Sequence, residues 1–268
     1  MGIIQEINKY KYAYFGFDPS RETPSDIWNA IPTLMGSNDA TNWNFIAYIQ
    51  LLGNLRDGNV NKINGVYYIW GTLACYTTKD FESFDKIDVS ILTNDNFTEV
   101  WAPEMFKDLN GNYHIIYVAT TNGARHIYTA DFDISSGTLT NAFKIVNIPL
   151  SQSIDPTINI INNAYYLQVS SGYKTNIYKS TTDFASGYSN YDTNIISQAA
   201  NWYEAPEWLI DGENVYMYQD KIIGYLSGIE DSGYMTYRTS KTSDLSVWSE
   251  ENNVVSAMNM RHGSFIKA

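Results

Sequence analysis

The chain has 268 residues, of which 44% are hydrophobic and 17% charged, a balance typical of a globular protein. Its net charge of −12 at pH 7 disfavours nucleic acid as a partner, because phosphate contacts need clustered lysine and arginine side chains. The single cysteine, Cys75, excludes an intramolecular disulfide framework.

The N-terminal stretch "MGIIQEINKYKYAYFGF" lacks the basic start and long apolar core of a secretory signal, so we expect no signal peptide in it. No apolar run of about 18 residues occurs, so we expect no transmembrane helix and no membrane partner. These patterns leave the localisation unassigned.

Four segments, taken in chain order, share one pattern. They are "RDGNVNKINGVYYIWGT" from Arg56, "WAPEMFKDLNGNYHIIYVAT" from Trp101, "IDPTINIINNAYYLQVSS" from Ile154 and "EAPEWLIDGENVYMYQD" from Glu204. Each has a polar or small pair at its head, a short apolar strand, an Asn/Asp/Gly turn and a second strand rich in Tyr, Ile and Val. The Asn-Gly and Asp-Gly turns predict β-hairpins.

A second marker follows each hairpin and also occurs near the N-terminus. It is a strand ending in Ser or Thr, then an aspartate, then an aromatic residue a few positions later. The aspartates of this marker are expected to form turns; they are Asp39, Asp80, Asp131, Asp183 and Asp244.

The unit heads at Asp57, Ala102, Asp155 and Ala205 are about 45 to 53 residues apart, which is the period of a four-stranded propeller blade. A fifth unit is split between the C-terminal "RHGSFIKA" and the N-terminal "KYKYAYFGF", so that one blade closes the ring and removes exposed sheet edges. We therefore predict an all-β fold, a single five-bladed β-propeller domain over residues 1–268. The alternative is a β-sandwich with regularly spaced strands.

Three acids occupy the heads of these units. In a propeller the first strand of every blade lines the central channel and runs in the same direction, so Asp57, Asp155 and Glu204 are expected to meet in one cup. Grouped carboxylates repel one another and resist burial, so their grouping needs a reason. Turn capping or a structural cation would be structural reasons. Glycosidic bond cleavage is the functional one, because it needs one protonated and one ionised carboxyl group.

The order of the motifs "RDG", "WAPE", "IDP", "EAP" and "RHGS" resembles glycoside hydrolase family 43 and related five-bladed glycosidases, over nearly the whole chain. The resemblance implies inverting hydrolysis of terminal arabinosyl, xylosyl or galactosyl residues of an oligosaccharide or polysaccharide. It assigns Asp57 as general base and Glu204 as general acid. Asp155 would raise the pKa of Glu204 and hold its orientation. The short loops favour action on chain ends.

Further residues of the predicted cup follow from their positions. Trp101, Trp202 and Tyr203 offer aromatic faces on which a sugar ring can stack. Arg56 and Arg261 flank strand heads and are expected to bind hydroxyl groups or pair with the acids.

His262, in "RHGS", matches a family histidine near the channel that often lies beside a bound calcium or its water shell. The resemblance thus allows a structural calcium there, although no cofactor is required. The alternative is a hydrogen-bonded structural histidine, and calcium prefers oxygen ligands.

Several other residues receive structural expectations. The family base usually lies in an early "DP" segment, but Asp18 of Asp18-Pro19 is followed by a polar stretch and is expected to be a surface-turn residue. Glu104 and Glu207, each farther along its strand, are expected to be structural. Arg125 and His126 in "GARHIY" lie on a neighbouring strand from which they could approach the cup, but a core or surface role is favoured for both.

Two rival functions remain open. A retaining fructan-acting relative would carry an "NDPN"-like segment on the first inner strand, and no such segment occurs in register. A non-catalytic carbohydrate-binding propeller, as in a surface or viral adhesin, fits the Tyr-rich composition equally well. Binding alone, however, does not require three acids at strand heads.

Overall fold

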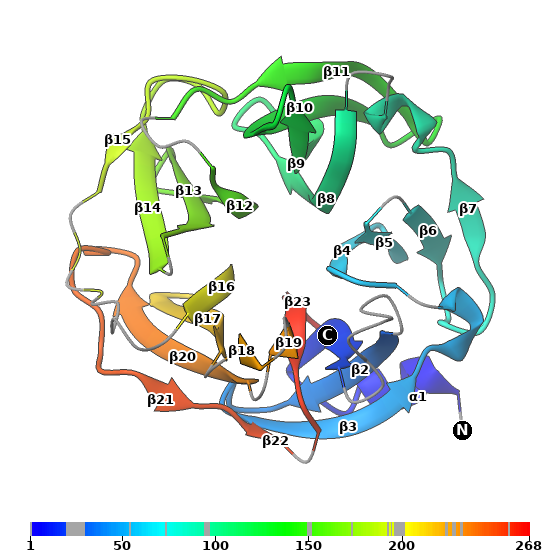
Figure 1. Cartoon of the computed structure of the whole chain (residues 1–268). Coiled ribbons are helices and arrows are strands. Elements are labelled where there is room, and N and C mark those ends of the chain that lie inside the picture. Colours follow the sequence, from blue (N-terminus) through cyan, green and yellow to red (C-terminus); the bar gives the residue numbers. More distant parts are fainter. Residues whose placement is uncertain are drawn as a thin grey trace.

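The computed structural model describes residues 2–19, 30–53, 55–72, 74–93, 97–148, 152–172, 174–191, 193, 195, 202–222, 225–226, 229–230, 233–256 and 258–268. Five sheets of four or five strands are arranged in a ring around a central axis (Figure 1). This arrangement confirms the predicted five-bladed β-propeller and excludes the β-sandwich.

Four of the blades are continuous in sequence, and their strands follow one another from the axis to the rim. Blade 2 consists of β4 (Asn59–Ile63), β5 (Val66–Gly71), β6 (Ala74–Thr78) and β7 (Asp85–Ile87). Blade 3 consists of β8 (Phe97–Lys107), β9 (Tyr113–Thr121), β10 (Ala124–Asp133) and β11 (Thr138–Ile145). Blade 4 consists of β12 (Ile154–Ile161), β13 (Ala164–Ser171), β14 (Lys174–Ser180) and β15 (Ser189–Asn190). Blade 5 consists of β16 (Trp202–Asp211), β17 (Asn214–Ile222), β20 (Gly233–Lys241) and β21 (Asn252–Asn253).

Blade 1 joins the two ends of the chain, as the sequence predicts. From the axis outwards it contains β23 (Arg261–Lys267), β1 (Tyr12–Asp18), β2 (Ile31–Ser37), β3 (Asn42–Tyr48) and β22 (Val255–Ser256). At Gly263 a side chain would collide with the carbonyl oxygen of Phe15, so glycine permits the close pairing of β23 with β1. The ring is therefore closed by main-chain hydrogen bonds between its first and last strands.

The hydrophobic core is divided into clusters that lie between neighbouring blades. Trp70 of blade 2 meets Phe132 of blade 3 edge to face, with ring centroids 5.4 Å apart. Tyr218 of blade 5 stacks on Phe265 of blade 1 at 3.7 Å. Many of the aromatic residues thus serve blade packing, where each large ring buries apolar area and adds an aromatic contact.

The hairpin turns have the backbone that their residues predict. Asn64 and Gly65, between β4 and β5, both have positive φ, and so do Asn162 and Asn163, between β12 and β13. Positive φ at both central residues marks a type I′ turn, whose twist matches that of the flanking strands.

Four of the five marker aspartates form turns. Each of these four carboxylates accepts a backbone N–H two residues later, at Thr41, Glu82, Ala185 and Ser246. The expectation is wrong for Asp131, which lies within β10 and contacts His114 Nδ1 at 2.8 Å. Asp133 makes the turn instead, because β10 continues two residues beyond the marker.

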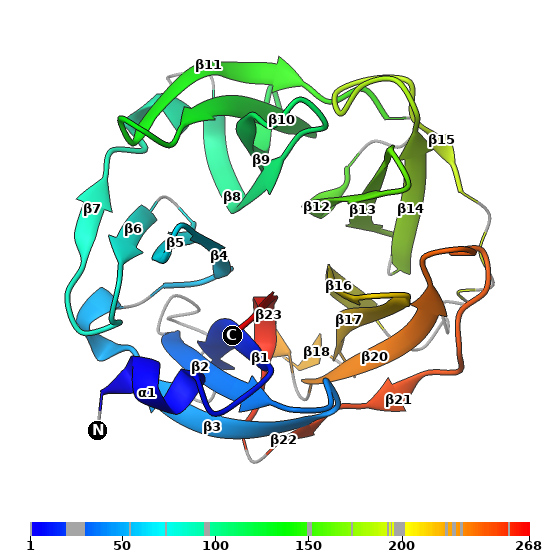
Figure 2. The same ribbon diagram turned by 180° about the vertical axis from the view of Figure 1, so that it is seen from behind.

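The remaining elements are short. They are α1 (Ile3–Ile7), the 3-10 turns Gln50–Leu52 and Ser90–Leu92, and the hairpin β18 (Tyr225–Leu226) with β19 (Ile229–Glu230). Seen from behind, α1 lies in the foreground against blade 1 (Figure 2). None of the helices in the described ranges is long and apolar enough to span a bilayer.

Candidate active site

One residue at the head of each innermost strand has a left-handed backbone. These residues are Asp57, Ala102, Asp155, Ala205 and His262, with φ between 34° and 55°. In blades 1, 3, 4 and 5 the strand register shifts at this point, which is the mark of a β-bulge. A bulge redirects the side chains beside it. Alanine occupies two of the five positions, so the left-handed backbone is set by the geometry of the blades and not by the acidic side chains.

The bulge produces two neighbouring rings of side chains. Asp57, Asp155 and His262 occupy the left-handed positions, whereas Glu204 lies one residue earlier, at the position of Trp101 in blade 3. From the sequence, the three acids are expected at equivalent strand heads. The structure separates them into two adjacent positions and still brings them together.

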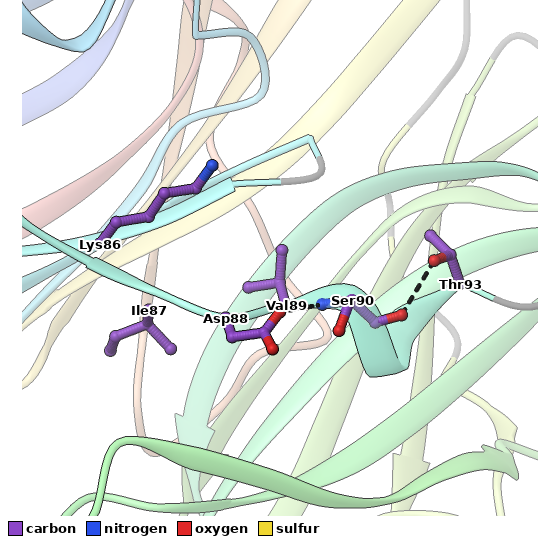
Figure 3. Close-up of a pocket in the computed structure, with 6 residues that line it drawn as sticks. All are labelled: Lys86, Ile87, Asp88, Val89, Ser90 and Thr93. Carbon is purple, nitrogen blue, oxygen red and sulfur yellow. Dashed lines mark hydrogen bonds between the residues drawn. The ribbon is translucent and has the colours of Figure 1, made fainter.

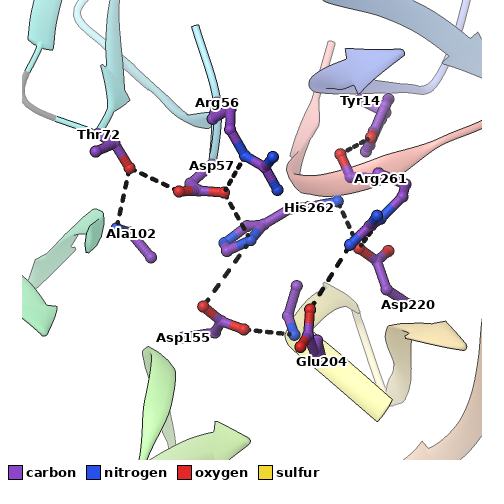
Figure 4. A network of polar contacts seen from close by, with 11 residues as sticks. Tyr14, Arg56, Asp57, Thr72, Ala102, Asp155, Glu204, Asp220, Arg261 and His262 are labelled. Atoms are coloured by element: carbon purple, nitrogen blue, oxygen red, sulfur yellow. Dashed lines mark hydrogen bonds and ion pairs between the residues drawn. The ribbon is translucent and has the colours of Figure 1, made fainter. Parts of the chain in front are cut away.

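These residues surround a cavity of about 290 Å³ at the axis. Every predicted site residue except Tyr203 lines it. The lining residues are Arg56, Asp57, Trp101, Arg125, Ile154, Asp155, Trp202, Glu204, Arg261 and His262. Figure 4 shows Asp57, Asp155 and Glu204, from blades 2, 4 and 5, gathered around His262 and Arg261 of β23.

Tyr203 lies elsewhere. Its side chain is buried, and the ammonium group of Lys221 lies 5.8 Å from the centre of its ring. Successive side chains of a strand point to opposite faces, so Trp202 and Glu204 share the cavity face and Tyr203 takes the other one. Stacking of Tyr203 on a sugar in the cavity is therefore not supported. Its position next to Glu204 in the sequence does not bring its side chain into the cavity.

Asp57 is held by three groups. His262 Nδ1 lies 3.1 Å from its Oδ1, Thr72 Oγ1 donates a hydrogen bond of 2.6 Å to its Oδ2, and Arg56 Nε lies 3.7 Å from Oδ1. Burial favours the neutral carboxyl, but these partners outweigh it and hold the pKa of Asp57 well below its usual range. Asp57 is therefore an ionised carboxylate at neutral pH.

His262 links the two aspartates, since its Nδ1 also lies 3.9 Å from Asp155 Oδ1. Burial lowers the pKa of His262, but the charges of Asp57 and Asp155 outweigh this effect and raise it to about 10. The imidazole is thus a cation between two acids, a role that agrees with the hydrogen-bonded structural alternative of the sequence analysis.

The other two acids of the cavity, Asp155 and Glu204, both have a raised pKa. Burial and the charge of Asp57 raise the pKa of Asp155, whose Oδ2 accepts a hydrogen bond of 3.1 Å from the backbone N–H of Ala205. Burial and then the charge of Asp155 raise the pKa of Glu204 to about 7, against the opposing effect of Arg261. Glu204 therefore retains its proton over a large part of the neutral range.

Asp220 completes the site and was missed by the sequence analysis. Asp220 of β17 is the direct cross-strand partner of Glu204 of β16. Two acids placed opposite each other in this way are unfavourable by themselves, because like charges repel. Arg261 lies between them, with Nε 3.0 Å from Asp220 Oδ2 and Nη2 3.6 Å from Glu204 Oε2. Asp220 Oδ2 also accepts the backbone N–H of His262 at 3.1 Å. The sequence signal that could have identified Asp220 is an acid at the end of the mainly apolar and aromatic strand "VYMYQD".

A second pair of acids, Glu104 and Glu207, lies two residues beyond the bulges of β8 and β16 and outside the cavity lining. Burial raises the pKa of Glu104, and the charge of Glu207 raises it further, against a hydrogen bond from Thr157. Burial raises the pKa of Glu207 to about 8, although hydrogen bonds to Glu104 and Thr157 oppose the shift. The pair thus lies outside the cavity lining, and its structural role stays a prediction.

His262 is the residue beside which the resemblance places a calcium ion. Calcium takes six to eight oxygen ligands, whereas His262 Nδ1 faces Asp57 and Asp155. Across the described ranges, no three His, Cys, Asp or Glu side chains form a group that could hold a metal ion. These residues do not fit the ligand set of a calcium ion, and the structural calcium stays a prediction.

Three further positions were given structural expectations, and only one of them, Arg125, lines the cavity. Asp18 is buried at the end of β1 and accepts a hydrogen bond of 2.9 Å from Tyr48, so the expectation of a surface turn is wrong. His126 is exposed, as expected, but Arg125 lines the cavity. A larger hollow of about 480 Å³ lies on the outer part of blade 2, from Lys86 to Thr93 (Figure 3), and has no comparable cluster of acids.

No protein-family model and no curated protein matches the sequence. Solved structures match the fold at low identity. An endo-1,4-β-xylanase from Bacteroides thetaiotaomicron VPI-5482 aligns with a TM-score of 0.66 and 14% identity, over 94% of this chain and 93% of that one. An endo-arabinase from the same organism aligns with a TM-score of 0.55 and 15% identity, over 74% of this chain and 81% of that one.

A thermostable family-43 glycoside hydrolase aligns with a TM-score of 0.58 and 17% identity, over 78% of each chain. The resemblance seen in the short motifs is therefore matched by the three-dimensional arrangement. The chain shares the five-bladed propeller fold of family 43 glycoside hydrolases.

Proposed function

We propose that the protein is a glycoside hydrolase in which Glu204 is the general acid and Asp57 the general base. The observation that carries this proposal is that two carboxyl groups in one cavity have their pKa values shifted in opposite directions. The pKa of Glu204 is raised to about 7, and that of Asp57 is held well below its usual range. Carboxyl groups whose environments separate their pKa values in this way are suited to opposite proton-transfer roles.

The reaction uses both groups on one sugar. Glu204 donates its proton to the glycosidic oxygen as the bond to the leaving group breaks. Asp57 takes a proton from a water molecule that attacks the anomeric carbon from the opposite face, which inverts the configuration. Asp155 keeps the pKa of Glu204 high through its charge, and its bond to the Ala205 N–H steadies the adjoining backbone.

The other cavity residues bind and position the sugar. Trp101 and Trp202 present indole rings at the wall, where a sugar ring stacks on an apolar face. Arg56 and Arg261 are held by carboxylates of the site and donate hydrogen bonds to hydroxyl groups. Neighbours named as a xylanase, an arabinase and an exo-β-1,3-galactanase favour xylosyl, arabinosyl or galactosyl residues as the substrate.

A panel of aryl arabinosides, xylosides and galactosides tests the proposal. Glu204→Gln should lose turnover by about 10²- to 10⁴-fold on a substrate with a poor leaving group, because that range is typical of a general acid. Glu207→Gln is the matched control, since Glu207 is a buried acid on the same strand with a similarly raised pKa but lies outside the cavity lining.

The anomer released first, followed by NMR, tests inversion separately. A retained anomer would replace the base mechanism with a covalent one. Sugar binding without turnover across the panel would favour the carbohydrate-binding module instead.

A further inference from the structure

Arg125 differs from the other cations of the cavity. Arg56 lies 3.7 Å from Asp57, Arg261 contacts Asp220 and Glu204, and His262 contacts Asp57. The side chain of Arg125 lines the same cavity, yet it makes no hydrogen bond or ion pair with any other residue that the structure describes. Among the described residues, no carboxylate pairs with its charge.

The fold explains how Arg125 reaches this wall. It is the second residue of β10, directly after the turn at Asn122 and Gly123, and it pairs with Thr120 of β9. Thr120 in turn pairs with Glu99 of β8, so Glu99 and Arg125 share one face of the blade. The carboxylate of Glu99 accepts a hydrogen bond of 2.9 Å from Thr120 and does not meet Arg125.

We propose that Arg125 forms a subsite for an anionic substituent, a carboxylate or a sulfate ester, on the bound sugar. This inference rests on the proposed function and specifies its substrate class. A guanidinium is permanently charged, and its planar set of N–H donors matches carboxylate and sulfate oxygens in pairs. Such a group on the ligand would supply the anionic partner that none of the described residues gives to Arg125.

The position of Arg125 decides which part of the ligand it meets. Strand β10 lies two strand spacings, about 10 Å, outward from the innermost strand β8. Trp101 of β8, in the same blade, lines the cavity wall. A substituent that reaches Arg125 from a sugar stacked on Trp101 would therefore extend outward from the axis.

The net charge of −12 limits the kind of anion. A long polyanion would be repelled by the acidic surface, whereas one charge held in the cavity interacts over a short range. Surface charges are largely screened beyond about 8 Å at physiological ionic strength. The favoured ligand is thus a single acidic residue, or an acidic decoration on a neutral chain.

A binding experiment tests this subsite without relying on turnover. Glu204→Gln protein is titrated with sugar pairs that differ at C6, namely methyl glucuronide against methyl glucoside, and galacturonate against galactose. Galactose 6-sulfate against galactose distinguishes a sulfate from a carboxylate source. Intrinsic fluorescence reports binding, because Trp101 and Trp202 line the cavity.

We expect at least one acidic sugar to bind about 10- to 100-fold more tightly than its neutral partner, as for a hydrogen bond to a charged group. Adding Arg125→Gln should abolish the preference, and Arg125→Lys should retain part of it. Lys86→Gln is the charge control, since Lys86 is exposed on the outer part of blade 2. Thermal unfolding checks that each variant is folded.

Equal binding of acidic and neutral sugars, or binding of no acidic sugar at all, overturns the subsite. A preference that survives Arg125→Gln overturns it as well. Failure of the proposed function looks different. In that case the acidic preference depends on Arg125, but the unsubstituted protein hydrolyses no glycoside, neutral or acidic.

Discussion

The inner strands carry two pairs of acidic residues, which differ in their partners and in their access to a ligand. At the bulges, Asp155 and Glu204 face the cationic groups of His262 and Arg261 and line a cavity. Two residues farther along their strands, Glu104 and Glu207 bond to one another and to Thr157, away from the cavity.

The pKa values alone do not separate these groups. Burial raises the pKa of Glu204 to about 7 and that of Glu207 to about 8. A perturbed carboxyl is thus a candidate for function only when it also meets a cavity and a partner with the opposite proton-transfer role. Asp57 supplies that partner at the cavity, and the Glu104–Glu207 pair has no counterpart of this kind in the described chain.

The largest effect should come from breaking the ionised half of the cavity site. Asp57→Asn removes the base and should lower kcat/KM by about 10²- to 10⁴-fold. Glu104→Gln should change kcat/KM by less than about fivefold, because Glu104 does not reach the ligand. Steady-state kinetics on the best aryl glycoside measures both, and similar losses in the two variants would remove the distinction between the two groups.

A smaller loss of activity is expected from a change at Asp220, which holds Arg261 of the cavity. Asp220→Asn removes the charge that holds Arg261 Nε and leaves Arg261 free to pair more closely with Glu204. Because a hydrogen bond between charged groups contributes about 1.5–3 kcal/mol, we expect kcat/KM to fall roughly tenfold or more. Unchanged kcat/KM at every pH would show that Asp220 does not position Arg261 for the reaction.

The pH profile sharpens the comparison further. In the unsubstituted protein kcat/KM should fall above about pH 7, as Glu204 loses its proton. Asp155→Asn removes a negative charge that raises the pKa of Glu204, so this alkaline limb should move to lower pH by about one unit. A limb that stays in place or moves upward would contradict the role given to Asp155.

The smallest effect on activity, and a distinct effect on stability, should come from Glu207. Its pKa is raised from 4.5 to about 8 by burial, so its stabilising contribution is fully present below pH 4.5 and is lost as the pH rises through 8. Glu207→Gln should remove this part of the pH dependence of the free energy of unfolding. Denaturant unfolding between pH 5 and about pH 9 measures it, and an unchanged slope would show that Glu207 ionises normally.

Local patterns in the sequence predict most of the fold and the main acids of the site. Alternating strands, Asn-Gly turns and unit heads at a blade-length period are short-range signals, and each is set by the backbone preferences of a few residues. The same period indicates that Asp57, Asp155 and Glu204 converge, and the match of "RHGSFIKA" to a first strand indicates how the ring closes.

The finer features depend on contacts between distant segments. The bulges place Glu204 one residue before the left-handed position, strand alternation turns Tyr203 away, and the β9–β10 turn carries Arg125 to the cavity wall. Asp220 of β17 becomes part of the site only because blades 5 and 1 are neighbours in the ring, which brings it to Arg261 of β23, 41 residues away in sequence. Register and blade packing set these positions, and no short stretch of residues encodes either of them.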